Sequence, residues 1–233
     1  RCEGPRPSNR RRILLGSEAA MKARLAHLFV FAGAQVIFMV TTRGNNGGTF
    51  GVIFYQAVTL LCCYILLDLD YDVKLLSREA APEGRGLGKQ ILRGCGYGVF
   101  FAVCVFVSAF FFADSVTLIP AHIFELDART ICVHLSMQLL IAFSEEALFR
   151  YYLHEALRNF KLPDWLWAAL ISLLFGALHL YNNQIVVQFW IATVFSLYVF
   201  GLKLSRRRET YCTLAVTHYV YNLCWFYLFG MAV

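Results

Sequence analysis

Residues 91–113 have the sequence ILRGCGYGVFFAVCVFVSAFFFA, in which Arg93 is the one charged residue. The apolar residues do not alternate with polar ones, and the run exceeds the roughly 20 residues that a helix needs to cross the hydrocarbon core of a bilayer. Because lipid offers no water to unpaired backbone groups, a spanning segment must be a helix or part of a closed barrel. This stretch therefore predicts a transmembrane helix.

Six further apolar runs of similar length lie on either side of it. The chain has 233 residues, of which 59% are hydrophobic and 15% charged, against about 45–50% and about 25% in ordinary soluble domains. This composition excludes a disordered chain, a fibrous repeat and an ordinary soluble globule. We predict an all-α, polytopic transmembrane helical bundle, that is, an integral multi-pass membrane protein. Its seven expected spanning helices are 25–42, 49–67, 91–113, 131–157, 164–181, 184–204 and 211–230.

The basic residues predict how this bundle is oriented. Of the 21 Lys and Arg residues, 18 lie in the N-terminal tail and in, or at the edges of, the connections that follow the second, fourth and sixth runs. The opposite side carries Arg43 and Arg129. Since basic residues concentrate on the cytoplasmic side, we expect a cytoplasmic N-terminus, with a basic tail over 1–24 and the bundle over 25–233. The net charge of +6 then reflects topology, so the expected partner is the lipid bilayer and not nucleic acid.

The fourth run contains charged residues that a membrane helix rarely carries. Each of Glu145, Glu146 and Arg150 costs roughly 2.5–3.5 kcal/mol at the centre of a bilayer, so such residues indicate a functional site. Glu146 and Arg150 are four residues apart and share a helix face, which predicts an internal ion pair. Glu145 is expected to point about 100° away with no partner on its own helix, as a general base in a dry cavity would.

Two later runs carry matching polar residues. Phe175 and His179 are four apart on the fifth run, and His218 and Asn222 are four apart on the seventh, so each pair shares a helix face. Glu145 and His179 are both roughly 24 Å along their helices from the turn between the fourth and fifth runs. Taken singly, each cluster has an inert explanation as a packing pair or an interhelical hydrogen bond. Their occurrence together predicts one polar site inside the bundle.

Three other intramembrane protease chemistries do not fit the sequence. A zinc protease needs H-E-x-x-H, but His154-Glu155 is followed by Arg158 at the position of the second histidine. A G-x-S turn for a serine nucleophile is absent, and so is the G-x-G-D of intramembrane aspartyl proteases.

The ordered motifs E-E-x-x-x-R, F-x-x-x-H and H-x-x-x-N on three spanning helices resemble the CPBP family. This family includes the type II CAAX prenyl endopeptidases and the Abi-type, or bacteriocin-processing, proteins. The resemblance covers roughly residues 130–230. The residues that carry it are Glu145, Glu146, Arg150, Phe175, His179, His218 and Asn222.

The resemblance implies an intramembrane, glutamate-dependent endopeptidase. In that family pattern Glu145 and His179 activate a water, and His218 and Asn222 donate hydrogen bonds to the oxyanion of the tetrahedral intermediate. Glu146, Arg150 and Phe175 would then have supporting roles. The implied substrate is a membrane-associated peptide, such as a prenylated CAAX C-terminus or a bacteriocin leader. No cofactor is implied, although zinc at Glu145, His179 and His218 is an alternative.

Two other classes of function remain open from the sequence. The first is a non-catalytic membrane scaffold, or a bacteriocin-immunity-type protein, in which the motifs are kept for structure. The second is a transporter or proton carrier that uses Glu145 as a relay. Transporter helices are often interrupted by Gly or Pro at the midplane, and none of the seven runs contains Pro.

Overall fold

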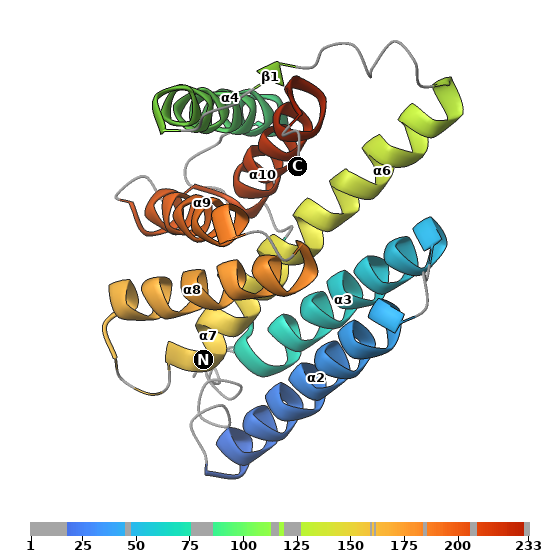
Figure 1. Cartoon of the computed structure of the whole chain (residues 1–233). Helices are drawn as coiled ribbons and strands as arrows, with labels where there is room; N and C mark the ends of the chain where they lie inside the picture. Colours follow the sequence, from blue (N-terminus) through green and yellow to red (C-terminus); the bar gives the residue numbers. More distant parts are fainter. Residues whose placement is uncertain are drawn as a thin grey trace.

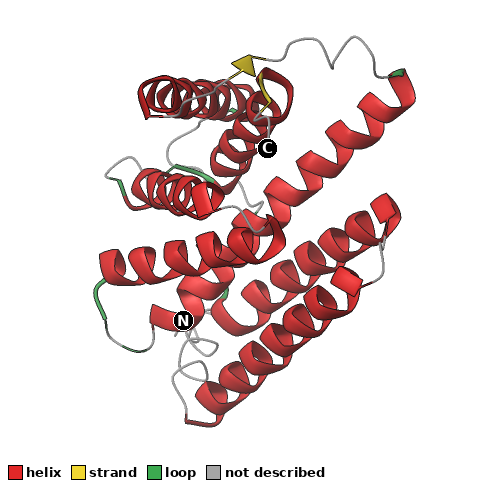
Figure 2. Ribbon diagram, viewed as in Figure 1, coloured by secondary structure: helices red, strands yellow, loops and turns green. Residues whose placement is uncertain are grey.

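The structure is a computed structural model, and the residues that it describes form helices almost throughout. Figure 2 shows this helical content, with two very short strands in the described part of the chain. The described residues are 18–44, 48–75, 86–112, 117–118, 127–158, 160, 162–183, 186–205 and 209–230. The predicted all-α, polytopic bundle is confirmed.

Seven helical rods make up the bundle within these described ranges. One of them is continuous but changes type along its length, as α6, η2 and α7. The helices are α2 (Glu18–Gly44), α3 (Gly48–Tyr71), α4 (Leu87–Phe112), α6 (Ala128–Glu145), η2 (Glu146–Leu153), α7 (His154–Arg158), α8 (Asp164–Asn183), α9 (Val186–Leu204) and α10 (Tyr211–Leu228).

The boundaries differ from the predicted ones at both ends of the chain. The first helix begins at Glu18 and not at residue 25, so the expected limit of the basic tail at residue 24 lies inside α2, and residues 1–17 are outside the described part. The last helix ends at Leu228, because β2 (Phe229–Gly230) pairs antiparallel with β1 (Thr117–Leu118). Hydropathy alone did not separate this short pairing from the helix before it.

Among the described residues, four helical segments are long and apolar enough to cross a membrane: Gly48–Tyr71, Leu87–Ser108, Ala128–Arg158 and Val186–Leu204. A shorter apolar helix covers Asp164–His179. Large apolar side chains point outward from the bundle, among them Phe29, 73% exposed, and Phe50, 81% exposed. Apolar surface of this extent needs a cover, which the bilayer provides for an integral, multi-pass membrane protein.

The α6–η2–α7 rod runs obliquely through the bundle (Figure 1), with α2 and α3 on one side and α4, α9 and α10 on the other. Helices α3 and α10 both pack against α6, α8 and α9 form an antiparallel pair, and α4 lies along α10. The main core lies between η2, α8, α9 and α10, around Phe149, Phe175 and Phe195. This arrangement brings the fourth, fifth and seventh predicted runs together.

Helix α6 begins where the side chain of Asp127 accepts a hydrogen bond from the backbone N–H of Thr130 at 2.8 Å. The Thr130 hydroxyl donates to the same carboxylate at 2.9 Å. Together these hydrogen bonds hold the pKa of Asp127 below its usual value, because they favour the ionised form. The cap sets the start of the helix that carries Glu145.

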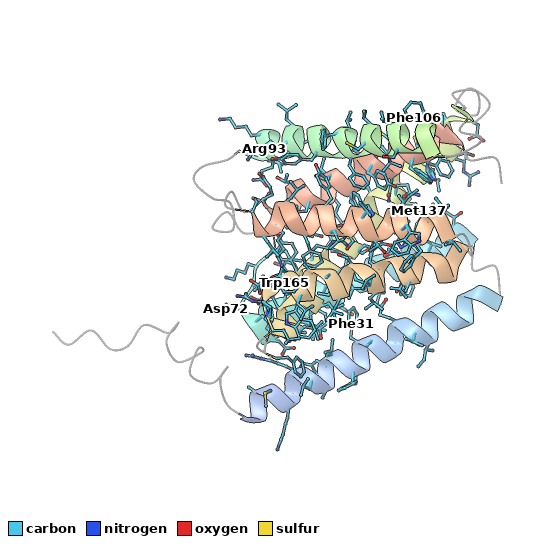
Figure 3. All side chains as sticks on the ribbon, turned by 60° about the vertical axis from the view of Figure 1, so that its left-hand side comes forward. Phe31, Asp72, Arg93, Phe106, Met137 and Trp165 are labelled. Atoms are coloured by element: carbon cyan, nitrogen blue, oxygen red, sulfur yellow. The ribbon has the colours of Figure 1, made fainter. Side chains whose placement is uncertain are left out.

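One end of the bundle gathers residues that we assigned to the cytoplasmic side. Figure 3 shows Asp72, Arg93 and Trp165 towards this end and Phe106 towards the other. Asp72 follows α3, whereas Arg93 and Trp165 lie near the starts of α4 and α8. The cytoplasmic orientation itself stays a prediction, and the basic residues 206–208 lie outside the described residues.

Glycines on one face of α4 permit its close contact with α10. A Cβ added at Gly98 would lie 2.7 Å from the carbonyl oxygen of Thr217, and one added at Gly94 would lie 2.8 Å from that of Thr213. By contrast, a Cβ at Gly96 would meet nothing within 4 Å. Small residues allow membrane helices to approach in this way, and here they fix the helix that carries His218 and Asn222.

This contact predicts different effects for two alanine substitutions on α4. Gly98→Ala should destabilise the bundle by about 1–3 kcal/mol, because the backbone of α10 must move away from the added methyl group. Gly96→Ala should leave stability unchanged or raise it slightly, since alanine favours the helix. Thermal unfolding of the two purified variants in detergent measures the difference. Equal unfolding temperatures would contradict the close contact.

Candidate active site

A cavity of about 480 Å³ lies between α6, α8, α9 and α10. The four side chains that the sequence proposed as catalytic, Glu145, His179, His218 and Asn222, all line it. Its other lining residues are Gln138, Ile141, Phe175, Gln188, Ile191, Ala192, Phe195, Tyr221, Trp225 and Phe226. The cavity therefore combines one polar group of residues with a largely apolar and aromatic wall.

Behind the polar group lies a buried chain of charged residues. Glu146 and Arg150 are both 0% exposed, and the Nε atom of Arg150 is 3.2 Å from Oε2 of Glu146. The other oxygen of Glu146, Oε1, accepts a hydrogen bond from Nδ1–H of His218 at 2.8 Å. The predicted pair between Glu146 and Arg150 is thus present, and Glu146 also fixes the imidazole of His218.

Glu145 approaches the other nitrogen of the same imidazole. Its Oε2 lies 3.7 Å from Nε2 of His218, and this buried oxygen has no hydrogen-bond partner within the described residues. The sequence placed Glu145 on a different face from Glu146, with no partner on its own helix. The structure supplies a neighbour from another helix, because His218 of α10 lies between the two carboxylates.

Local hydrogen bonds hold the backbone on either side of Glu145. The hydroxyl of Tyr211, on α10, donates to the carbonyl of Phe143 at 2.7 Å, and the hydroxyl of Ser144 donates to Gln56 on α3. From Glu146 onward the helix is a π-helix, a form that often occurs at functional sites. Lys203 of α9 donates to the carbonyl oxygen of Arg150 within this segment.

His179 lies on the cavity wall formed by α8. Its Nδ1 is 2.8 Å from the carbonyl oxygen of Phe175, and because a carbonyl only accepts, Nδ1 carries the proton. In the neutral ring Nε2 is then left as an acceptor. Both side chains line the same cavity, and within the described residues no hydrogen bond joins His179 to Glu145.

Phe175 packs between several members of the site. Its ring centroid lies 4.5 Å from that of His179 and 6.0 Å from that of His218. The guanidinium carbon of Arg150 lies 4.5 Å from the centroid of the same ring, a cation–π distance. Phe175 therefore covers the buried cation and supports both histidines, which agrees with the packing role that the resemblance implies.

Asn222 projects into the cavity one turn beyond His218 on α10. Its Nδ2 donates to Oε1 of Gln138 at 3.1 Å, and Gln138 also lines the cavity. Gln138 was not among the site residues predicted from the sequence. A signal was present, since Gln138 lies seven residues, about two helical turns, before Glu145 in an apolar run.

Metal binding was the alternative left open for this site. Among the described residues no group of three or more His, Cys, Asp or Glu side chains is placed to hold a metal ion. Glu145, His179 and His218 would have to move together to form one. As these three side chains lie, they do not form a zinc site.

Fold and site together define a polytopic helical membrane protein with a buried, charged centre facing an internal cavity. A family model described as type II CAAX prenyl endopeptidase Rce1-like matches residues 127–224. This segment contains every proposed site residue, and its similarity to that family agrees with the CPBP resemblance. No curated protein and no solved structure gave a match to the chain.

Proposed function

We propose that the protein is an intramembrane endopeptidase that hydrolyses a peptide bond of a membrane-associated substrate. The observation that carries this proposal is the shared cavity of Glu145, His179, His218 and Asn222, in which a carboxylate oxygen of Glu145 is buried without a hydrogen-bond partner. An unsatisfied buried carboxylate is costly. Such a carboxylate can, however, hold a water molecule and accept its proton.

Glu145 and His179 supply the two acceptors that such a water needs. The Nδ1 proton of His179 is committed to Phe175, so its Nε2 can accept one water hydrogen while the carboxylate of Glu145 accepts the other. The water oxygen then attacks the peptide carbonyl as its proton moves to Glu145. When the C–N bond breaks, Glu145 returns this proton to the leaving nitrogen, as general acid–base catalysis requires.

His218 and Asn222 supply hydrogen bonds to the oxyanion. Glu146 holds the Nδ1–H of His218, so the Nε2 side of the ring faces the cavity. When that nitrogen carries a proton, Nε2–H can donate to the oxyanion. Each oxyanion donor is worth about 2.7–4 kcal/mol in related chemistry. Asn222 has a second Nδ2–H available beside the one given to Gln138.

The apolar wall of the cavity suits a substrate that arrives from the lipid. Phe195, Tyr221 and Trp225 lie on α9 and α10 beside the polar residues. A peptide with a prenylated CAAX C-terminus could place its lipid along this wall and its peptide bond near Glu145. We therefore propose such a peptide as the substrate, with an unmodified membrane peptide as the competing possibility.

Mass spectrometry of a cleaved peptide library tests the proposal. The purified protein is incubated in lipid vesicles with a mixture of farnesylated and plain C-terminal peptides. We expect cleavage at one position near the modified cysteine and faster loss of the farnesylated members. Preferred cleavage of the plain members would overturn the substrate. The absence of any product would favour the non-catalytic scaffold.

Removal of metal ions should not change the rate of cleavage. The proposed chemistry uses protein side chains alone, so dialysis against a strong zinc chelator should leave the rate within the error of the untreated enzyme. A chelator-treated sample to which zinc is returned is the control. Loss of activity on dialysis and its recovery with zinc would contradict the metal-free mechanism.

A further inference from the structure

A chain of polar side chains runs from Asn222 away from the catalytic carboxylate. Nδ2 of Asn222 donates to Oε1 of Gln138 at 3.1 Å, and Nε2 of Gln138 lies 3.2 Å from Nε2 of His134. Nδ1 of His134 lies 2.8 Å from the hydroxyl oxygen of Tyr227. The chain passes between α6 and α10, and its members are four residues apart on α6 and five apart on α10.

We propose that Gln138 is a positioning residue that fixes the side-chain amide of Asn222 so that its N–H, and not its oxygen, faces the reacting carbonyl. This inference rests on the proposed endopeptidase function. Gln138 acts through Asn222 and needs no contact with the substrate. His134 and Tyr227 continue the chain and set the orientation of Gln138 itself.

The donors and acceptors of the chain agree with one orientation throughout. The amide nitrogen of Gln138 can only donate, so Nε2 of His134 must accept and carries no proton. The proton of neutral His134 is then on Nδ1, which donates to the hydroxyl of Tyr227. With its NH₂ group used by His134, Gln138 can turn only its oxygen towards Asn222. Asn222 must therefore offer its nitrogen.

This orientation matters because the two ends of a carboxamide have opposite effects on an oxyanion. The N–H end stabilises the developing negative charge, whereas the oxygen end repels it. Without a fixed partner the amide of Asn222 could turn by half a rotation at little cost, since the two ends have almost the same shape. The hydrogen bond from Gln138 selects the productive end before the substrate binds.

A purely structural role for Gln138 is the competing explanation, since interhelical hydrogen bonds also hold membrane helices together. Gln35 offers a matched comparison, because its amide donates to Thr59 at 3.1 Å between α2 and α3, away from the cavity lining. If Gln138 only joins helices, replacing either glutamine by methionine should lower stability without a selective effect on catalysis.

A double-mutant cycle separates the two roles. Rates are measured with the peptide that the wild-type protein cleaves best, for Gln138→Met, Asn222→Ala and the double variant. We expect Gln138→Met to lower kcat roughly ten- to hundred-fold, which is less than the full loss expected when an oxyanion donor is removed. The value of KM should stay unchanged within about twofold. In the Asn222→Ala background the same change should lower kcat by less than about twofold, because the effect passes through Asn222.

Two further variants complete the test. His134→Phe keeps the ring packed on Phe226, whose ring centroid is 3.9 Å away, but removes the acceptor for Gln138, so a smaller fall in kcat is expected. Gln35→Met should leave kcat unchanged. The inference is overturned if Gln138→Met lowers kcat equally in the wild-type protein and in Asn222→Ala. It is also overturned if the substitution raises KM instead of lowering kcat, or if kcat does not change. If the wild-type protein cleaves nothing, the proposed function fails first and this inference with it.

Discussion

Replacing Glu145 with glutamine should lower the rate of peptide cleavage by about 10²–10⁴-fold, the usual contribution of a general base. The substitution keeps the size and shape of the side chain but removes its ability to take a proton from water. The buried Oε2 atom of Glu145 has no hydrogen-bond partner within the described residues, so little structural interaction is lost. Single-turnover cleavage of the best library peptide, measured in vesicles, gives the ratio of rates.

Glu155→Gln is the matched control for this prediction. Glu155 lies on the same rod but pairs with Arg158 at 3.2 Å near the end of α7, outside the cavity lining. Its replacement should leave cleavage unchanged, and both variants should unfold near the wild-type temperature. Full activity in Glu145→Gln would remove the assigned base. In that case the non-catalytic scaffold becomes the better explanation of the bundle and its polar centre.

The residues of the site could be found in the sequence because their signals are strong and local. A charged group in a membrane helix is costly wherever the helix lies, which singled out Glu145, Glu146 and Arg150. The spacing of four between His218 and Asn222 places both on one face of any regular helix. These arguments do not depend on how the helices pack, and the structure brings Glu145, His218 and Asn222 to one cavity.

The connections among these residues depend on packing and were not predictable in the same way. Whether His218 faces Glu145, Glu146 or both depends on where α10 crosses the rod, and no local spacing contains that information. The π-helix from Glu146 was also not visible, because the pair of Glu146 and Arg150 suits a π-helix as well as an α-helix. Only tertiary contacts, such as that of Lys203 with the carbonyl of Arg150, distinguish the two.

Gln138 shows a different limit. A neutral amide costs far less in a membrane helix than a charge, so one glutamine in an apolar run is weak evidence of function. Its significance comes from its partners, Asn222 on α10 and His134 one turn earlier on α6. The second of these contacts is local and visible in the sequence, whereas the first joins residues 84 positions apart.

Replacing Arg150 with methionine should destabilise the protein by about 3–5 kcal/mol, the usual result of removing one partner from a buried ion pair. The side chains of Arg150 and Glu146 are both 0% exposed, so no water can replace the guanidinium group. Arg150 also packs on Phe175, with 4.5 Å between the guanidinium carbon and the ring centroid. Methionine fills part of the volume, so the loss measured is mainly that of the charge.

Arg158→Met provides the comparison, because Arg158 is 51% exposed and its pair with Glu155 is solvated; such a pair is worth about 0–1 kcal/mol. Denaturant unfolding in mixed micelles measures both variants. The double variant Glu146→Gln with Arg150→Met should recover part of the lost stability, because the carboxylate that Arg150 compensated is also removed. This double variant should nevertheless stay inactive, because a glutamine amide at position 146 does not hold His218 as the carboxylate does. Equal stability of Arg150→Met and Arg158→Met would mean that the buried centre is not held by charge pairing, and that packing around Phe175 alone orders the site.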